Sequence, residues 1–213
     1  MSSALATRLL APLLFCVNAI AANIEATVLS PAGKPVEDAA VVMEPVVGAN
    51  PKRQRTVTIE QRDREFIPYV TIVQTGTMVE FPNHDAFKHH IYSFSPAKVF
   101  EIKLYADKPS QPVLFDKAGE VALGCNIHDW MEAYVLVVNS AYFAKTGSGG
   151  RAIIRDVPAG RYRLRVWHPR QKAEAPLRDV EVRSGPTPTR LDLLADVAAR
   201  ASKPKPPLDS GKY

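Results

Sequence analysis

The sequence predicts an all-β protein, because turn residues are frequent and the apolar stretches between them are short and alternating. The 213 residues include 18 prolines and 11 glycines, with valine-rich segments between them. Long segments with helical amphipathic spacing are scarce. Hydrophobic residues make up 46% of the chain, which is long enough for one large or two small domains with their own cores.

The expected strands are bounded by glycine, proline and asparagine turns. In the first part of the chain they cover residues 24–29, 39–43, 57–59, 69–81 (with a turn at Gly76), 90–94, 99–104, 121–125 and 134–138. After a Gly/Ser linker at 145–150 they cover 151–154, 162–167, 178–183 and 190–194. The Ala, Lys and Pro content that follows predicts a disordered tail over 196–213.

Residues 1–21 have the layout of a secretory signal peptide. Arg8 precedes an apolar run from Leu9 to Ile20, and Ala19-Ile20-Ala21 is a small-x-small cleavage pattern. The run is short for a bilayer span, and no later segment is long and apolar enough to cross a membrane. We therefore expect an exported protein, located in the periplasm or secreted.

Cleavage of that segment would leave Cys125 as the single thiol, because Cys16 lies within it. An unpaired thiol in an oxidising compartment needs protection, which a bound metal provides. The formal net charge of +5 would fall by one to +4, since Arg8 is the only charged residue of the segment. This mild basic bias, with no interleaving of arginines and aromatics, argues against a nucleic-acid partner.

Cys125, His128 and Met131 follow one another at three-residue intervals between two expected strands. A loop of this length can direct all three side chains toward one point. Soft sulfur combined with imidazole favours copper, and one cysteine, two histidines and a distant methionine make up the blue-copper ligand set. The pattern therefore predicts a copper site that needs one more histidine from a neighbouring strand.

Two adjacent residues, His89 and His90, are candidates for that histidine, at the start of the strand after a polar turn. His90 would share a strand face with Tyr92 and point away from the face of His89, which favours His89. Of the other histidines, His84 belongs to the polar turn and is expected to be solvated. His168 ends a strand far along the chain and is expected to lie outside the site.

About residues 60 to 139, the chain resembles the plastocyanin and amicyanin type of cupredoxin. The matching positions are Phe66-x-Pro68, Val73, Gly76, Val79, Phe81, Asn83-x-Asp85 and His89, then Phe115, Gly119, Cys125-x2-His128-x2-Met131 and Val135. The resemblance implies a Greek-key cupredoxin β-sandwich over 57–140, with one copper ion per chain held by His89, Cys125, His128 and Met131. The family often has Asn where this chain has His90.

The flanks resemble a carboxypeptidase regulatory-like, transthyretin-like β-sandwich. The matching segments are Val28-x2-Pro31-Ala32-Gly33-Lys34-Pro35-Val36-x2-Ala39-x-Val41 and Gly150-Arg151-Ala152-x4-Val157-Pro158-Ala159-Gly160-Arg161-Tyr162-x-Leu164. This implies a small discontinuous sandwich, residues 24–47 and 145–195, with the cupredoxin inserted in it. The whole chain also resembles periplasmic proteins labelled methylamine utilization protein, which implies electron transfer linked to amine oxidation.

These features favour a one-electron carrier that is not an enzyme, since five histidines are too few for a multicopper cluster. Its partner would be a cytochrome or a dehydrogenase that docks transiently over Ile127, His128 and Trp130, unless Trp130 packs inward. Lys88 and Lys98 would add a positive rim. The alternatives are copper buffering or delivery, and a structural or ligand-binding sandwich whose metal is incidental.

Overall fold

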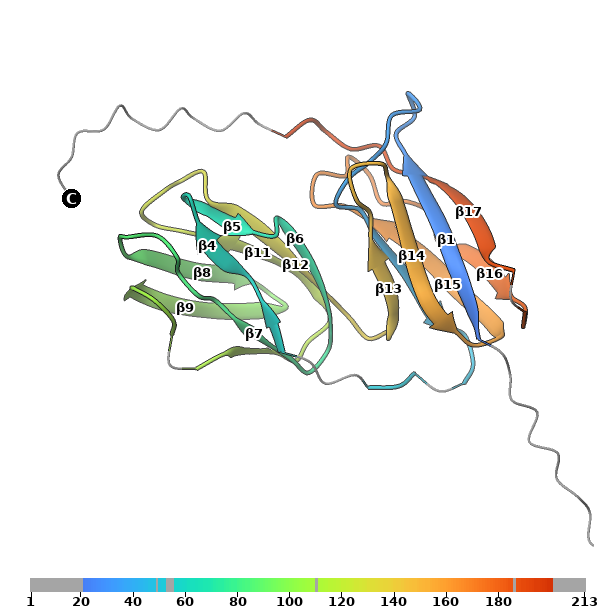
Figure 1. The fold of residues 1–213 in the computed structure, drawn as a ribbon, viewed down its shortest axis with the longest axis horizontal. Coiled ribbons are helices and arrows are strands. Elements are labelled where there is room, and N and C mark those ends of the chain that lie inside the picture. Colours follow the sequence, from blue (N-terminus) through green and yellow to red (C-terminus); the bar gives the residue numbers. More distant parts are fainter. Residues whose placement is uncertain (1–20, 49, 53–55, 110, 186, 201–213) are drawn as a thin grey trace, which may run out of the picture.

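The computed structural model describes residues 21–48, 50–52, 56–109, 111–185 and 187–200, and the regular structure of these ranges is β throughout (Figure 1). The all-β prediction is therefore confirmed. Among the described residues, none forms a helix that could cross a membrane. The predicted signal peptide falls almost wholly outside these ranges, and so do residues 201–213 of the predicted tail.

The strands form two sandwiches side by side (Figure 1). The first sandwich packs the sheet β14-β1-β17 against the sheet β13-β2-β15-β16. Alternation along the strands supplies its core: in β15, the side chains of Tyr162, Leu164 and Val166 are buried. The strands are β1 (Ala22–Leu29), β2 (Ala40–Pro45), β13 (Tyr142–Lys145), β14 (Arg151–Val157), β15 (Gly160–Trp167), β16 (Arg178–Val182) and β17 (Thr189–Leu194).

The second sandwich lies between β2 and β13 in sequence, and it contains the five-stranded sheet β6-β12-β11-β8-β9. Facing this sheet are the three-stranded sheet β10-β7-β3 and the hairpin β4-β5, and both enclose a core around Phe81, Phe115 and Ile91. The strands are β3 (Thr56–Thr58), β4 (Glu60–Arg62), β5 (Glu65–Ile67), β6 (Val70–Gln74), β7 (Thr77–Glu80), β8 (His89–Ser95), β9 (Lys98–Tyr105), β10 (Val113–Phe115), β11 (Gly119–Gly124) and β12 (Glu132–Val138).

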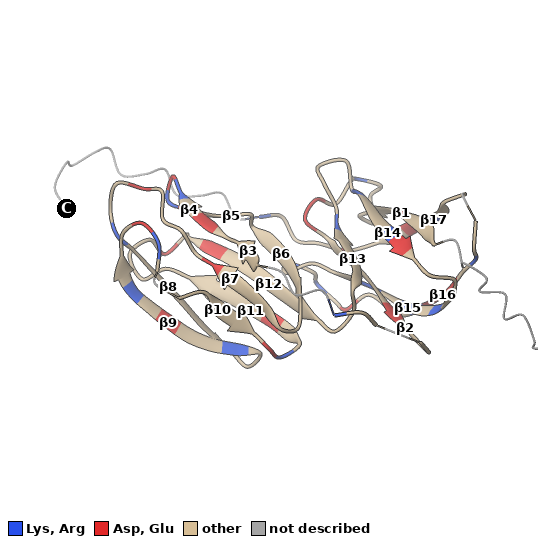
Figure 2. Ribbon diagram, turned by 60° about the horizontal axis from the view of Figure 1, so that its bottom comes forward, with Lys and Arg blue, Asp and Glu red and all other residues tan. Residues whose placement is uncertain are grey.

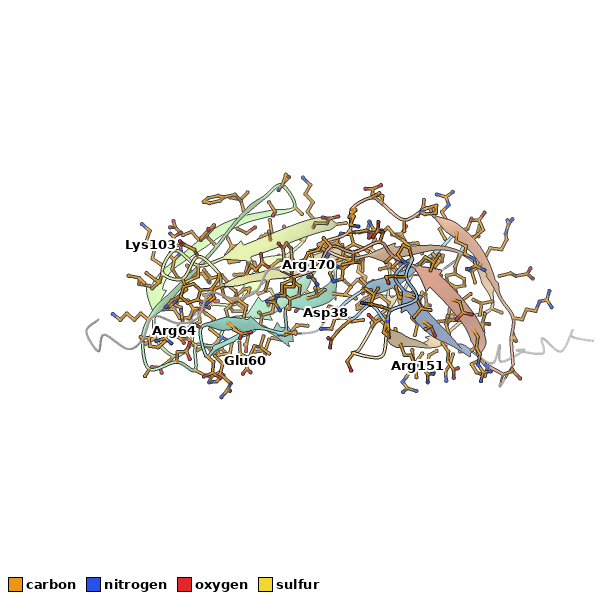
Figure 3. The ribbon with its side chains drawn as sticks, turned by 90° about the horizontal axis from the view of Figure 1, so that it is seen from above. Asp38, Glu60, Arg64, Lys103, Arg151 and Arg170 are labelled. Carbon is orange, nitrogen blue, oxygen red and sulfur yellow. The ribbon has the colours of Figure 1, made fainter. Side chains whose placement is uncertain are left out.

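A third apolar core joins the two sandwiches. Ala40, Val42 and Trp167, on the outer face of the β2-β15 sheet, pack with residues on the outer face of β6 and β12, among them Leu136 and Val138. Arg170 belongs to the same junction, with its guanidinium carbon 5.8 Å from the centre of the Tyr69 ring (Figure 3). The first sandwich, called the flanking sandwich below, therefore covers part of the five-stranded sheet and leaves the end that carries Cys125 uncovered.

The structure differs from two of the predicted boundaries. The strand β13 pairs with β2 and so places residues 142–144, before the expected linker, in the flanking sandwich. Residues 196–198, predicted as the start of a disordered tail, are instead hydrogen-bonded to residues 170–172. The expectation of disorder was based on composition alone, and it was wrong for these residues because polar residues and alanine can still pair through their backbone groups.

Candidate metal centre

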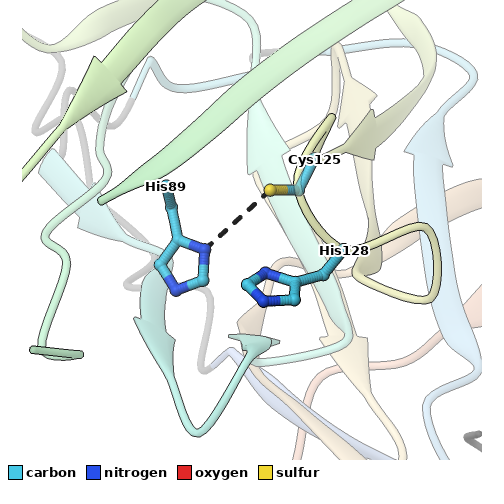
Figure 4. A group of neighbouring side chains, drawn as sticks. All are labelled: His89, Cys125 and His128. Carbon is cyan, nitrogen blue, oxygen red and sulfur yellow. Dashed lines mark hydrogen bonds between the residues drawn. The ribbon is translucent and has the colours of Figure 1, made fainter. Parts of the chain in front are cut away.

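Three side chains from two neighbouring strands and one loop meet at the open end of the second sandwich (Figure 4). His89 begins β8, Cys125 directly follows β11, and His128 lies in the loop between β11 and β12. One ligand atom from each residue lies within 4.8 Å of the other two. Because β8 and β11 are paired, with Tyr92 opposite Gly124, the sheet itself sets the separation of His89 and Cys125.

Cys125 is 3% exposed, and its Sγ lies 3.9 Å from His89 Nδ1. Burial raises the pKa of the thiol, but its hydrogen bond with His89 and those from the backbone N–H groups of His90, Ile127 and His128 outweigh burial, so the pKa is lowered. The surroundings therefore favour a thiolate, which is the form that binds metals.

His89 is fully buried and uses both ring nitrogens. Its Nδ1 faces Cys125, and its Nε2 lies 2.7 Å from Asp85 Oδ2. Burial lowers the pKa of His89, but the hydrogen bonds to Cys125 and Asp85 raise it further than burial lowers it, so the pKa is raised overall. The ring orientation is thus fixed from both sides before any metal binds.

His128 has a half-buried ring that lies 5.1 Å from the ring of His89, centre to centre. Its Nδ1 is buried and has no hydrogen-bond partner among the described residues. Burial first, then the positive charges of His89 and Arg64, lower the pKa of His128. A neutral imidazole with an unused buried nitrogen is suited to ligate a metal ion, so the donor set fits a bound ion.

Met131 ends the loop and is buried in the same core cluster as Cys125. Its backbone N–H donates to the carbonyl of His128 at 2.9 Å, which closes the loop on itself. Both Cys125 and Met131 also line a groove of about 610 Å³ on the outer face of the five-stranded sheet, beside Tyr92, Phe94 and Tyr134. The predicted role of Met131 as a fourth, axial ligand stays a prediction.

The other histidines lie outside this group. His90 points to the opposite face of β8, where its Nε2 lies 2.9 Å from Glu101 Oε1 and its ring packs near Tyr92. His84 is exposed, with Nε2 3.2 Å from Glu60 Oε2. His168 is buried in the flanking sandwich, directly after β15. The structure therefore brings His89, and not His90, to Cys125.

Comparison with known proteins finds no matching family model and no matching curated protein. Among solved structures, the chain is similar to a Cu-containing nitrite reductase (NirK) from Thermus scotoductus SA-01, with 25% identity and a TM-score of 0.38 over 53% of this chain and 28% of that one. It is also similar to a reduced Cu(I) form of a mutant of amicyanin, with 14% identity and a TM-score of 0.36 over 46% of this chain and 98% of that one. A third similar structure is a purple cupredoxin from Nitrosopumilus maritimus, with 21% identity and a TM-score of 0.35 over 38% of this chain and 99% of that one. Since these TM-scores are below 0.5, the metal centre is inferred from the residues of this chain.

The surface around the site differs in part from the predicted one. Ile127 is 49% exposed, whereas Trp130 is half-buried, with its ring 5.1 Å from that of His128 and packed against the core. Lys98 is at the far end of the β8-β9 hairpin, because Lys98 pairs with Ser95 while His89 pairs with Tyr105. Six strand residues, or about 20 Å, separate the two ends, so Lys98 cannot contribute to a rim at the site.

Two residues beside the site were not predicted to take part in it. The ring centre of Phe87 lies 5.0 Å from the ring centre of His89 and 5.7 Å from that of His128. Arg64, in the turn between β4 and β5 (Figure 3), lies over the ring of Phe87, with its guanidinium carbon 4.9 Å from the ring centre. No spacing in the sequence indicates either contact, because Arg64 and Phe87 lie in turns between strands, where no alternation fixes the direction of a side chain.

Proposed function

We propose that this protein would bind one copper ion through His89, Cys125 and His128, with Met131 as a weaker fourth ligand, and that it serves as a one-electron carrier. The observation that carries the proposal is the convergence of two imidazoles and a thiol within 4.8 Å, at a site where His128 Nδ1 has no other partner among the described residues. When bound, copper would supply the redox chemistry. The protein contributes the ligands and holds them.

The surroundings of the ligands favour electron transfer over chemistry on a substrate. Cys125 and His89 are attached to paired strands, and backbone N–H groups and Asp85 hold their side chains. A site that is fixed in this way changes little in geometry between oxidation states, which keeps the barrier to electron transfer low. Burial of both residues also disfavours a copper-delivery function, since a delivered ion must leave quickly.

An electron partner would dock most readily over the loop between β11 and β12. The half-buried ring of His128 has exposed Ile127 beside it, and a small apolar area of this kind suits a transient contact. Acidic and basic residues are both present along β9 nearby, so net charge does not select the partner there (Figure 2). We propose a cytochrome or a dehydrogenase as partner, in the periplasm or outside the cell, in electron transfer linked to amine oxidation.

The proposal is tested by loading the purified protein with Cu(II) and titrating it electrochemically. We expect one reversible one-electron couple per chain. Cys125→Ser should abolish this couple because an alkoxide is a hard and poor substitute for thiolate. Asp129→Asn, an exposed position in the same loop, is the matched control and should keep the couple. An irreversible wave, or a couple that survives in Cys125→Ser, would show that the site does not carry electrons.

A further inference from the structure

Asp85 occupies an unusual position for a loop carboxylate, because it is nearly enclosed and faces His89 on the side away from Cys125. Its side chain is 8% exposed, and Oδ2 lies 2.7 Å from His89 Nε2. Asp85 does not belong to the group of residues whose ligand atoms meet at the metal site. It therefore contacts a ligand and not the metal position.

The carboxylate of Asp85 is itself held in place by the turn between β4 and β5. Oδ1 accepts the backbone N–H of Asp63 at 2.7 Å, and Oδ2 accepts that of Arg64 at 3.0 Å. Both turn residues have positive φ, 53° and 58°, the conformation in which consecutive N–H groups can point at one anion. The N–H of Asp85 in turn donates to Asn83 Oδ1 at 2.9 Å.

Both oxygens of Asp85 accept backbone N–H groups, as the oxygens of an ionised carboxylate do. An ionised carboxylate only accepts hydrogen bonds, so His89 Nε2 must be the donor. The proton of a neutral His89 is then on Nε2, and the lone pair is on Nδ1, which faces Cys125.

We propose that Asp85 is the positioning residue of the metal centre: it accepts the Nε2–H of His89, fixes the ring so that Nδ1 is the ligand atom, and tunes the redox potential. A carboxylate behind a ligating imidazole makes that imidazole a stronger donor. Its negative charge also favours Cu(II) over Cu(I), because the ion with the larger charge gains more from it. This inference rests on the proposed function, since it assumes that the bound metal is copper.

The variant to test is Asp85→Asn, which keeps the size of the side chain and one oxygen but removes the charge. Losing such an outer partner costs about 10- to 100-fold in metal affinity. If Cu(II) affinity falls by this factor and Cu(I) affinity does not, the potential rises by about 60 to 120 mV, at about 59 mV for each tenfold change. The matched control is Asp129→Asn, which removes an exposed carboxylate from the ligand loop and should shift the potential far less.

A second measurement needs neither copper nor a variant that folds. Nitrogen NMR of the metal-free wild-type protein should show His89 protonated at Nε2. Protonation at Nδ1 alone would overturn the proposal. An Asp85→Asn protein with a lower melting temperature but an unchanged potential would also overturn it, since Asp85 would then only brace the turn. Wild-type protein that binds no copper, yet shows the Nε2 tautomer, would refute the proposed function and leave the positioning role standing.

Discussion

His168 makes the stability of the flanking sandwich depend on pH. It is 2% exposed, and its Nδ1 accepts the N–H of Arg170 at 3.1 Å. Burial, helped by the positive charge of Arg170, lowers the pKa of His168 to about 4. The residue is therefore mostly neutral in the folded protein once the pH is a unit or more above that value.

The unfolded chain binds this proton more readily, because its histidine has the ordinary pKa of about 6.5. The stability due to neutral His168 is fully present above pH 6.5 and is lost as the pH falls from 6.5 toward 4. Each unit of pKa difference is worth about 1.36 kcal/mol, so the full loss is about 3 kcal/mol. That is a large part of the stability of an ordinary domain.

The assay is urea unfolding of the metal-free protein between pH 7.5 and 4, for the wild type and for His168→Gln. Glutamine does not titrate, so the difference in unfolding free energy between the two proteins should change by about 3 kcal/mol over this range. The contributions of groups that titrate alike in both proteins cancel in this difference. His84→Gln, which makes the same replacement at an exposed histidine, is the matched control. Parallel pH curves for wild type and His168→Gln would refute the reasoning.

Three further predictions concern the metal site. His89→Ala should weaken Cu(II) binding by well over the roughly 100-fold expected for the loss of a residue that only hydrogen-bonds to a ligand, whereas His90→Ala should keep a coloured site. Copper titration of the two variants is the measurement. Severe loss of binding in His90→Ala alone would make His90 the ligand. Met131→Leu should keep copper and raise the potential measured by voltammetry, because the axial bond is weak; complete loss of copper would contradict this role. Trp130→Ala should slow electron exchange with a cytochrome while the copper spectrum stays unchanged. An unaltered exchange rate would show that the partner docks on a different surface.

Much of the fold could be predicted because its longer strands alternate. In β15 the apolar residues Tyr162, Leu164 and Val166 face inward at every second position, and turn residues bound the strand. The strand β4 shows why other elements were missed: its sequence is polar, and its buried residue is Gln61, which bonds to the Tyr105 hydroxyl. The third core could not be foreseen either. Alternation along β15 predicts that Trp167 points outward from the flanking sandwich, but it does not predict which residues cover that outer face.

The site was predictable where its residues share one loop. The spacing of Cys125, His128 and Met131 is a local pattern, and the order of strands determines where it lies. The choice between His89 and His90 depends on which face of β8 points toward Cys125. Alternation along the strand puts the two histidines on opposite faces, and the pairing of β8 with β11 determines which face that is. The sequence places Asp85 in the Asn83-x-Asp85 pattern but assigns it no role. Its role depends on a turn more than 20 residues earlier, and only the folded chain brings them together.

The most direct test of the account is the copper content of the purified protein together with its visible and paramagnetic resonance spectra. We predict one copper per chain and an intense visible band in the oxidised form, from charge transfer between the Cys125 thiolate and Cu(II). Cys125→Ser should lack the band. An oxidised, copper-loaded wild-type protein without colour, or one whose band persists in Cys125→Ser, would contradict a centre built on His89, Cys125 and His128.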